Sequence, residues 1–342
     1  RPMPQGVPHP LTQLSPQQAM EAHDQLSGEG HASLHSVAVD DSRHVRDAAL
    51  ARARSGRAAF AADGEGSVQG GWVQVLKSGG TLDGDGNAAR NEYNGTATLV
   101  GYDYRFDNGW RIGALGGSGR TDADDDRGSR GRIKGDQFGL YVGQNWGAFT
   151  LGGGYAYARQ DVDVSRQVAF NGFADRTSAS YEGDTRQAFV DAGYRFGSDA
   201  WGVEPYAQFA QVRVSTDAFQ EAGGAAALHG ADSDSKVDLS TVGMRLNADL
   251  KGAQQEQSWL SLRGGIGWRH ASGDLTPQAR LAWSGGDAFV VSGAPLADDA
   301  TLLEAGIGAR LSANSLLELG YSGQLADEAS DHAVTARFSL RF

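Results

Sequence analysis

From about residue 67 to the end of the chain, apolar and polar residues alternate with a period of two. Near residue 100, for example, Val100, Tyr102 and Tyr104 share one face, while Gly101 and Asp103 share the other. Successive side chains of a β-strand point to opposite faces, so this period indicates strands that separate two different environments. Alternation sustained over many long segments is typical of a transmembrane β-barrel.

Twelve strands are expected, joined by connections that alternate between short and long. Short turns at one rim and long loops at the other are the usual arrangement of outer-membrane barrels. The long connections include 165–178, 218–233 and 272–298, which we expect to be loops. The fold predicted is an all-β membrane protein, a 12-stranded antiparallel up-and-down transmembrane β-barrel. The expected strands are 67–78, 91–106, 110–124, 131–146, 148–164, 179–196, 201–217, 234–251, 257–271, 299–312, 315–325 and 332–342.

The residues before the barrel divide into a linker, a helical segment and a second short linker. Residues 1–13 are rich in proline and are expected to be extended. Residues 14–56 form the helical segment: Ser15 and Pro16 suit its start and Gly56 its end. Gly28 and Gly30 should interrupt it, which leaves a main helix over 30–55. Residues 57–66 then lead into the barrel, which occupies 67–342.

The 30–55 helix is polar on nearly every side, which excludes both lipid and an ordinary protein core as its surroundings. A water-filled barrel lumen would accept it, and at 1.5 Å per residue the helix is about 39 Å long, enough to cross a bilayer core of about 30 Å. We therefore predict an N-terminal α-helix inside the lumen. The site residues that we predict on this pore helix are Leu34, Asp40, Asp41, Arg43, Arg46 and Asp47.

Glycine accounts for 49 of the 342 residues, and most strand glycines fall on the face expected to line the lumen. Glycine in a strand often marks the close approach of another element, here the lumen helix. The alternative is that small inner residues only relieve crowding in a narrow barrel. The lumen-facing wall predicted in this way contains Gly101, Gly139, Gly143, Gly152, Gly154, Gly193, Gly243, Gly306, Gly308 and Gly320.

Opposite charges on the helix and on the wall suggest ion pairs across the lumen, although the sequence leaves the individual pairs open. The helix cations could face wall carboxylates, and the helix carboxylates could face wall arginines. The cations are Arg43, Arg46, Arg52 and Arg54, with Asp103, Asp191, Glu204, Asp238, Glu304 and Glu318 as possible partners. The carboxylates are Asp40, Asp41 and Asp47, with Arg105, Arg195, Arg245, Arg269 and Arg310 as possible partners.

The composition excludes several classes of partner and chemistry. The net charge of -12 argues against nucleic acid as a partner, and the absence of cysteine excludes disulfides and thiol chemistry. No run of about 18 apolar residues provides a transmembrane helix. No signal peptide opens the chain, so residue 1 is expected to follow an upstream segment or a processing site.

Catalytic and metal motifs are weak. Asp41, Ser42 and His44 lie on one helix, which does not give a triad geometry. His31 and His35 lack the further ligands that zinc requires, and the Asp83–Asn94 stretch lacks the glycine and glutamate of a calcium loop. We expect no catalytic residue, metal site or cofactor.

The order of a polar helix followed by a C-terminal barrel resembles the autotransporter translocator domain of type V secretion. The most specific part runs from Leu26-Ser27-Gly28-Glu29 to Asp41–Ala48, which is similar to pore helices of autotransporters that carry subtilisin-like serine proteases. Gly101-Tyr102-Asp103 and Ala294-Pro295-Leu296-Ala297 also look like the family. The end of the chain, with Phe338, Leu340 and Phe342, resembles the signal recognised by the barrel assembly machinery.

The resemblance implies a translocator that exports its own N-terminal passenger to the cell surface and is then plugged by the helix. It implies residence in the bacterial outer membrane with both barrel termini in the periplasm and the long loops outside. The implied partners are outer-membrane lipid and lipopolysaccharide, the barrel assembly machinery and the passenger; a monomer is expected. Family members that cut themselves inside the barrel carry an Asn-Asn pair in the helix, and residues 30–55 contain no asparagine.

Two other functions are compatible with a twelve-stranded outer-membrane barrel. A twelve-stranded diffusion channel would have no lumen helix, so the 14–56 segment counts against it. An outer-membrane barrel hydrolase would need a histidine near serine or aspartate at a strand end, and His270 lies close to Ser272 and Asp274.

Overall fold

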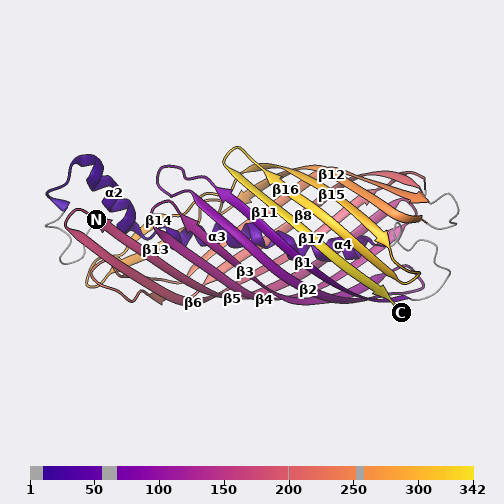
Figure 1. Cartoon of the computed structure of the whole chain (residues 1–342), viewed down its shortest axis with the longest axis horizontal. Helices are drawn as coiled ribbons and strands as arrows, with labels where there is room; N and C mark the ends of the chain where they lie inside the picture. The colour runs from indigo at the N-terminus through magenta and orange to yellow at the C-terminus, as the bar shows by residue number, and fades with distance from the viewer. Residues whose placement is uncertain (1–10, 56–67, 199, 252–257) are drawn as a thin grey trace.

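The computed structural model describes residues 11–55, 68–198, 200–251 and 258–342. Its main feature is a closed barrel of twelve long antiparallel strands, in which the last strand pairs with the first (Figure 1). The fold expected from the alternation is therefore confirmed. The strands are β1 Val68–Leu82, β2 Asn91–Arg105, β3 Arg111–Asp125, β4 Ser129–Trp146, β5 Phe149–Phe170, β6 Phe173–Tyr194, β8 Trp201–Thr216, β11 Ser233–Lys251, β12 Ser258–Gly273, β15 Asp299–Arg310, β16 Ser315–Leu325 and β17 Ala329–Arg341; the short β7, Phe196–Gly197, pairs with the start of β8.

Each strand sends one face outward and the other into the lumen. On β4, Phe138 and Leu140 are exposed, whereas Tyr141, on the opposite face, is buried. An exposed apolar face is costly in water and favourable in lipid, so this outward band is the surface that a bilayer covers. Aromatic contacts mark one edge of the band, where Trp110 packs edge-on against Trp146 and Trp146 stacks on Phe149.

The β5–β6 hairpin is longer than the alternation suggested. The expected loop 165–178 is wrong, because β5 continues to Phe170 and β6 begins at Phe173. Only Asn171 and Gly172 form the turn, where Gly172 has a positive φ of 82° that favours glycine. Polar outward residues made this stretch look like a loop, but a strand that extends beyond the lipid needs no apolar outer face.

A second small sheet lies at one end of the barrel. Its strands are β9 Phe219–Gln220, β10 Leu228–Gly230, β13 Gln278–Trp283 and β14 Phe289–Ser292, all within segments expected to be loops. Together with helix α2, Pro16–Ser27, these strands bury an apolar cluster that includes Leu26, Leu281 and Trp283. We call this the capped end; β13, β14 and α2 lie there, and the C-terminus lies at the opposite end (Figure 1).

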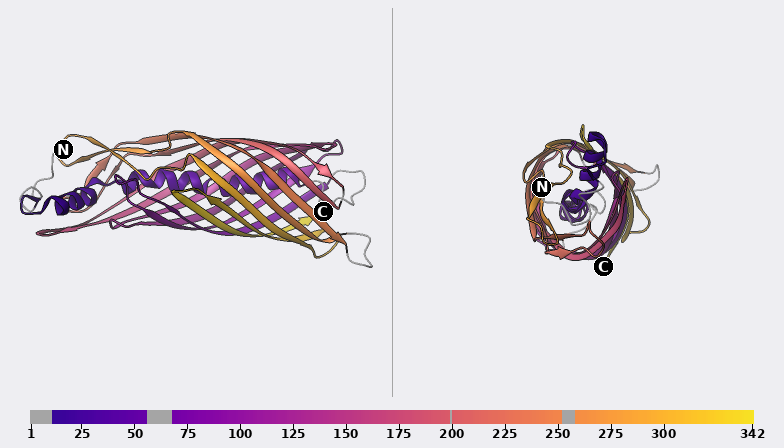
Figure 2. Two further views of the ribbon diagram at one scale, coloured as in Figure 1. Left: turned by 90° about the horizontal axis from the view of Figure 1, so that it is seen from above. Right: turned by 90° about the vertical axis from the view of Figure 1, so that its left-hand side faces the viewer.

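The helical segment continues from the cap into the barrel. Ser15 caps α2 in a complete capping box with Gln18, and Gly28, with a φ of 74°, ends that helix, both as expected. Two further helices, α3 Gly30–Asp41 and α4 Arg43–Arg54, meet at Ser42 and run along the lumen (Figure 2). None of the described helices is long and apolar enough to cross a membrane. The 57–66 linker and residues 1–10 lie outside the described residues.

Candidate functional site: the helix inside the barrel

The capped end of α3 is held by a buried charged network. The His31 ring is bonded on both sides: Nδ1 lies 3.0 Å from the Tyr181 hydroxyl and Nε2 lies 2.9 Å from a Glu221 carboxylate oxygen. Arg166 donates to both oxygens of the same carboxylate, at 2.7 and 2.6 Å. Burial alone would raise the pKa of Glu221, but hydrogen bonds from Arg166 and His31 outweigh it and hold that pKa at about 2. Glu221 is thus an ionised anchor for the start of α3.

The middle of α3 packs directly against the backbone of a long connection. Ser36 donates to the Ala294 carbonyl at 2.6 Å, and the Ala294 amide donates to Ser33 Oγ at 2.9 Å. A Cβ added to Gly293 would lie 2.4 Å from the Ser33 backbone nitrogen, so only glycine fits there. The stretch at 294–297 that resembles the family therefore lies against the lumen helix.

The junction of α3 and α4 carries a second charged cluster. Asp40 accepts a hydrogen bond from Gln324 at 3.1 Å and lies 3.9 Å from Arg269. Arg43 forms a buried ion pair with Asp331, whose carboxylate also accepts from Tyr93 at 3.0 Å. Asp331 falls in a connection that the alternation did not assign to a strand. Extending the inner face of β17 two residues backward from Ala333 would have found it.

The remaining predicted helix residues have separate surroundings. Arg46 donates to the Gln187 side-chain oxygen at 2.8 Å, and Asp41 accepts from Thr121. Leu34 lies against Gly131, where an added Cβ would come within 2.5 Å of its side chain. Asp47 is partly exposed and lines a lumen cavity.

The end of α4 is anchored by arginine. Arg52 makes two hydrogen bonds to the Asp103 carboxylate, at 2.9 and 3.0 Å, and Tyr141 donates to the same group at 2.8 Å. Arg54 lies 3.5 Å from Asp191. Cations near the last turn of a helix also interact favourably with its dipole. These ion pairs anchor the end of α4 to the barrel wall.

Only two of the ten predicted wall glycines meet the helix. A Cβ at Gly143 would lie 2.1 Å from the Ala53 carbonyl oxygen, and one at Gly152 would lie 3.3 Å from the Ala53 side chain. The other eight lie against neighbouring wall groups, so the helix is not what they accommodate. Each of these eight glycines has a wall residue close to the position of the added Cβ. The pairs are Gly101 with Trp72, Gly139 with Leu115, Gly154 with Phe189, Gly193 with Glu204, Gly243 with Tyr206, Gly306 with Leu319, Gly308 with Ser261 and Gly320 with Thr335.

Two further expectations about the lumen are wrong. Asp238 is not on the inner wall: Val237 and Leu239 on either side of it are buried, and Asp238 bonds to Gln211 on the outer face. The lumen around the helix is not simply water-filled either. Val37, Val45 and Leu50 are buried in one apolar cluster with wall residues, because the few apolar positions of the helix meet apolar patches on the wall.

On the far side of α4 a space remains between helix and wall. A cavity of about 170 Å³ lies between His44, Asp47 and Arg54 on the helix and charged side chains on β11, β12, β15, β16 and β17. Its wall charges are Arg245, Arg263, Glu304, Glu318 and Arg337. The lumen therefore combines a close contact on one side of α4 with a space lined by charged side chains on the other.

The C-terminal residues Phe338, Leu340 and Phe342 point outward and are 39%, 37% and 71% exposed. Phe338 and Leu340 lie on β17 beside β1, where the barrel closes, and Phe342 directly follows this strand.

The side chains of the weak catalytic motifs form hydrogen bonds or ion pairs that do not make a catalytic arrangement. The Ser42 hydroxyl donates to the Val39 carbonyl, and His44 is 3.8 Å from Asp41. His270 faces outward and bonds to Asp299 at 2.9 Å, rather than to Ser272 or Asp274. Within the described ranges, no group of three or more histidines and carboxylates could hold a metal ion.

A closed twelve-stranded barrel with a helix bound along its lumen defines an outer-membrane protein of the translocator class. The family description "Autotransporter beta-domain" matches residues 71–322, and the chain belongs to this family. It is the translocator domain of a type V secretion protein, and such a domain is not itself catalytic.

Relatives and solved structures agree with this assignment. An extracellular serine protease of Serratia marcescens is 33% identical over 96% of this chain, and the esterase EstA of Pseudomonas aeruginosa is 25% identical over 79% of it. The chain spans 31% and 43% of their lengths, respectively. The translocator domain of the autotransporter NalP from Neisseria meningitidis superposes with a TM-score of 0.72 at 15% identity, covering 92% of this chain and all of that domain.

Proposed function

We propose that this barrel exports an N-terminal passenger across the outer membrane, and that α3 and α4 then stay in the lumen and close it. The observation that carries the proposal is the set of contacts that bind this helix at both ends, through Glu221 at the capped end and Asp103 near the other. A helix in transit would need a smooth wall, whereas these buried ion pairs hold it in one register.

The proposed orientation puts the capped end outside the cell and both ends of the barrel sheet in the periplasm. Val68 begins β1 and Arg341 ends β17 at the same end of the barrel. Phe338, Leu340 and Phe342 would be read there by the barrel assembly machinery, and outer-membrane lipid would cover the apolar outer face. We propose that the barrel works as a monomer, since its sheet is closed and leaves no long free edge.

The passenger is proposed to be a hydrolase, because the similar proteins named above are a serine protease and an esterase whose lengths extend well beyond this region. The barrel itself is proposed to have no enzymatic role. Since residues 30–55 contain no asparagine, release of the passenger is assigned to an outside protease rather than to self-cleavage in the lumen.

A display assay tests export directly. An epitope tag is fused before Arg1, behind a secretion signal, in a Gram-negative host, and protease is added to intact cells. Removal of the tag is the expected result. Full protection of the tag, with the barrel correctly inserted, would contradict export and favour a channel.

A further inference from the structure

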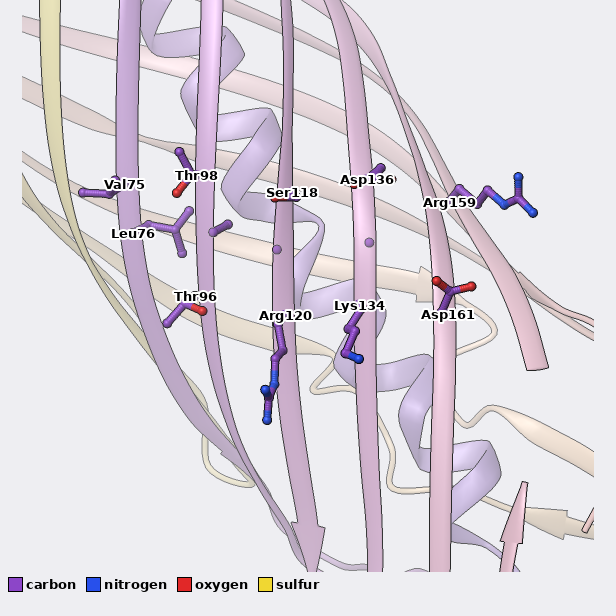
Figure 3. Close-up of a pocket in the computed structure, with 13 residues that line it drawn as sticks. Val75, Leu76, Thr96, Thr98, Ser118, Arg120, Lys134, Asp136, Arg159 and Asp161 are labelled. Atoms are coloured by element: carbon purple, nitrogen blue, oxygen red, sulfur yellow. The ribbon is translucent and has the colours of Figure 1, made fainter. Parts of the chain in front are cut away.

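A segment of the connection between β12 and β15 lies directly against the lumen helix. This segment is residues 293–297, which we call the strap. Its Ala294 and Leu296 are 0% and 5% exposed and belong to the same apolar cluster as residues of α3. The strap meets the helix from the lumen side, whereas exposed side chains such as Thr98 and Lys134 lie on the outer face of the wall, with the helix passing behind their strands (Figure 3).

The connection itself holds the strap in place. The Gly293 amide donates to the Pro277 carbonyl at 2.8 Å, and the Leu296 amide donates to the Leu275 carbonyl at 2.8 Å. Because these partners belong to the connection and not to the helix, the strap presents its backbone to α3 in a fixed position.

Two serines on one face of α3 bond to the strap. Ser33 and Ser36 lie three residues apart and are fully buried. The Ala294 amide donates to Ser33 Oγ at 2.9 Å, and the Ser36 hydroxyl donates to the Ala294 carbonyl at 2.6 Å. Since Ala294 is also buried, these two hydroxyl groups take the place of water at its amide and carbonyl.

The contact also limits the size of the side chains between strap and helix. A Cβ added to Gly293 would overlap the backbone of Ala32 and Ser33. Close approach of two backbones at a glycine leaves no room for a long side chain between them. The strap therefore fits a helix that has small residues at this point.

The sequence of the helix offers this fit in one register. Among residues 16–54, Ser33 and Ser36 are the only hydroxyl side chains spaced three residues apart. A slip of about one helical turn, or four residues, would bring other side chains to Ala294. The pairs brought there contain no two hydroxyls: Glu29 with Ala32 in one direction, and Val37 with Asp40 in the other. At least one buried backbone group of Ala294 would then lose its partner, which is costly.

An arginine of the wall connects the strap to the same region of α3. Arg269 on β12 donates to the Ala297 carbonyl at 3.3 Å and lies 3.9 Å from Asp40, seven residues after Ser33. The strap and this arginine thus contact α3 over two turns.

We propose that the strap selects the axial register in which the exported chain stops in the lumen, by accepting only the position that places Ser33 and Ser36 at Ala294. Gly293, Ala294 and Arg269 are positioning residues in this step. The ion pairs at the two ends and the contacts of α4 then hold the rest of the helix against the wall. The inference rests on the proposed function, because a stop presupposes a chain that has been exported through the barrel.

The test uses the whole chain with a reporter at the other end of the helix. The chain has no cysteine, so Ala53→Cys with Gly152→Cys supplies the only two thiols. A Cβ at Gly152 would lie 3.3 Å from Ala53 Cβ, close to the separation in a disulfide, and a slip of one turn would move Ala53 by about 5.4 Å. Outer-membrane fragments are equilibrated in a glutathione buffer, and free thiols are counted after unfolding with a maleimide-polyethylene glycol tag.

Two variants of this reporter chain change the two sides of the contact. Ser33→Ala/Ser36→Ala removes both hydroxyls from the helix, and Gly293→Ala changes only the strap. Each is expected to lower the equilibrium constant for closing the reporter disulfide about tenfold. The matched controls should close normally: Ser42→Ala loses a hydroxyl that bonds within the helix, and an added Cβ at Gly286 in Gly286→Ala would have no atom nearer than 3.5 Å.

Normal closing of the reporter in both variants would overturn the inference, as would equal losses in the controls. Heat-modifiable mobility checks that each barrel is folded, and Ser36→Ala alone replaces the double variant if that fails to fold. The display assay on the same chains separates the two proposals. Display by the variants is expected, and its loss only in them would assign the strap to transport and overturn its role as a stop. Absence of display from the reporter chain itself would remove the export function, while the reporter would still decide whether the strap sets the register.

Discussion

The two helices in the lumen are held in different ways. Every residue of α3 from Gly30 to Asp40 is buried, and its polar groups bond to partners all round the wall. In contrast, α4 touches the wall closely on one side, at Gly143 and Gly152, and faces a cavity on the other. The difference indicates that α3 closes the lumen while α4 sets the position of the helix through one tight contact and its terminal ion pairs.

The largest effect is expected from Gly143→Leu, which tests whether the contact with Ala53 sets the position of α4. Because even a Cβ at this position would lie 2.1 Å from the Ala53 carbonyl oxygen, the side chain should displace α4, at a cost above the roughly 3 kcal/mol of ordinary overpacking. Channel conductance in planar bilayers should rise. Gly116→Leu is the matched control, since its Cβ would face outward with no atom nearer than 3.6 Å. An unchanged, closed channel would show that α4 is not set by this contact.

The next largest effect is expected from Asp103→Asn. The substitution leaves Arg52 and Arg111 without their shared carboxylate, which should destabilise the bound helix by about 3 kcal/mol. Openings should become frequent in single-channel recordings. Arg186→Gln, which breaks an exposed pair with Asp184, should change little, by about 0.5 kcal/mol. Equal behaviour of the two variants would argue against anchoring at the end of α4.

Acid should loosen α3. Glu221 has a pKa of about 2 when folded and an ordinary value of 4.5 when unfolded, so its stabilisation is complete above pH 4.5 and is lost as the pH falls through 2. At pH 3 the loss is about 2 kcal/mol. Burial lowers the pKa of His31, which adds a loss in the same direction below pH 6.5.

Hydrogen exchange of the α3 amides measures this dependence. Exchange should accelerate between pH 4.5 and 2, after correction for the intrinsic rate, and Glu221→Gln should remove that part of the pH response. A wild-type profile that remains flat over this interval would exclude Glu221 as the anchor.

The smallest effect is expected from Asp47→Asn. Asp47 faces the cavity beside α4 and is partly exposed, so the change should alter stability by no more than about 0.5 kcal/mol. Denaturant unfolding of the refolded barrel measures it. A loss as large as that of Asp103→Asn would mean that the cavity side also anchors the helix.

The sequence determined the parts of this protein that depend on local periodicity. The alternation of outward Val100 and Tyr102 with inward Gly101 and Asp103 follows from strand geometry alone. Ser15, Pro16 and Gly28 marked the first helix because capping depends only on nearby backbone groups. Because the helix is too polar for lipid and precedes twelve alternating strands, the sequence also predicts that it lies in the barrel lumen.

Only the tertiary structure decided which groups meet across the lumen. Period two places a residue on the inner face but does not say what lies opposite, so Gly143 meets the helix while Gly101 meets Trp72. Arg43 selects Asp331, nearly the whole chain away, because the barrel's closure brings β17 beside β1 and the helix passes both. The β9 and β10 strands, of two and three residues, are too short to have a period of their own, and they form because the end of the barrel holds them against β13 over α2.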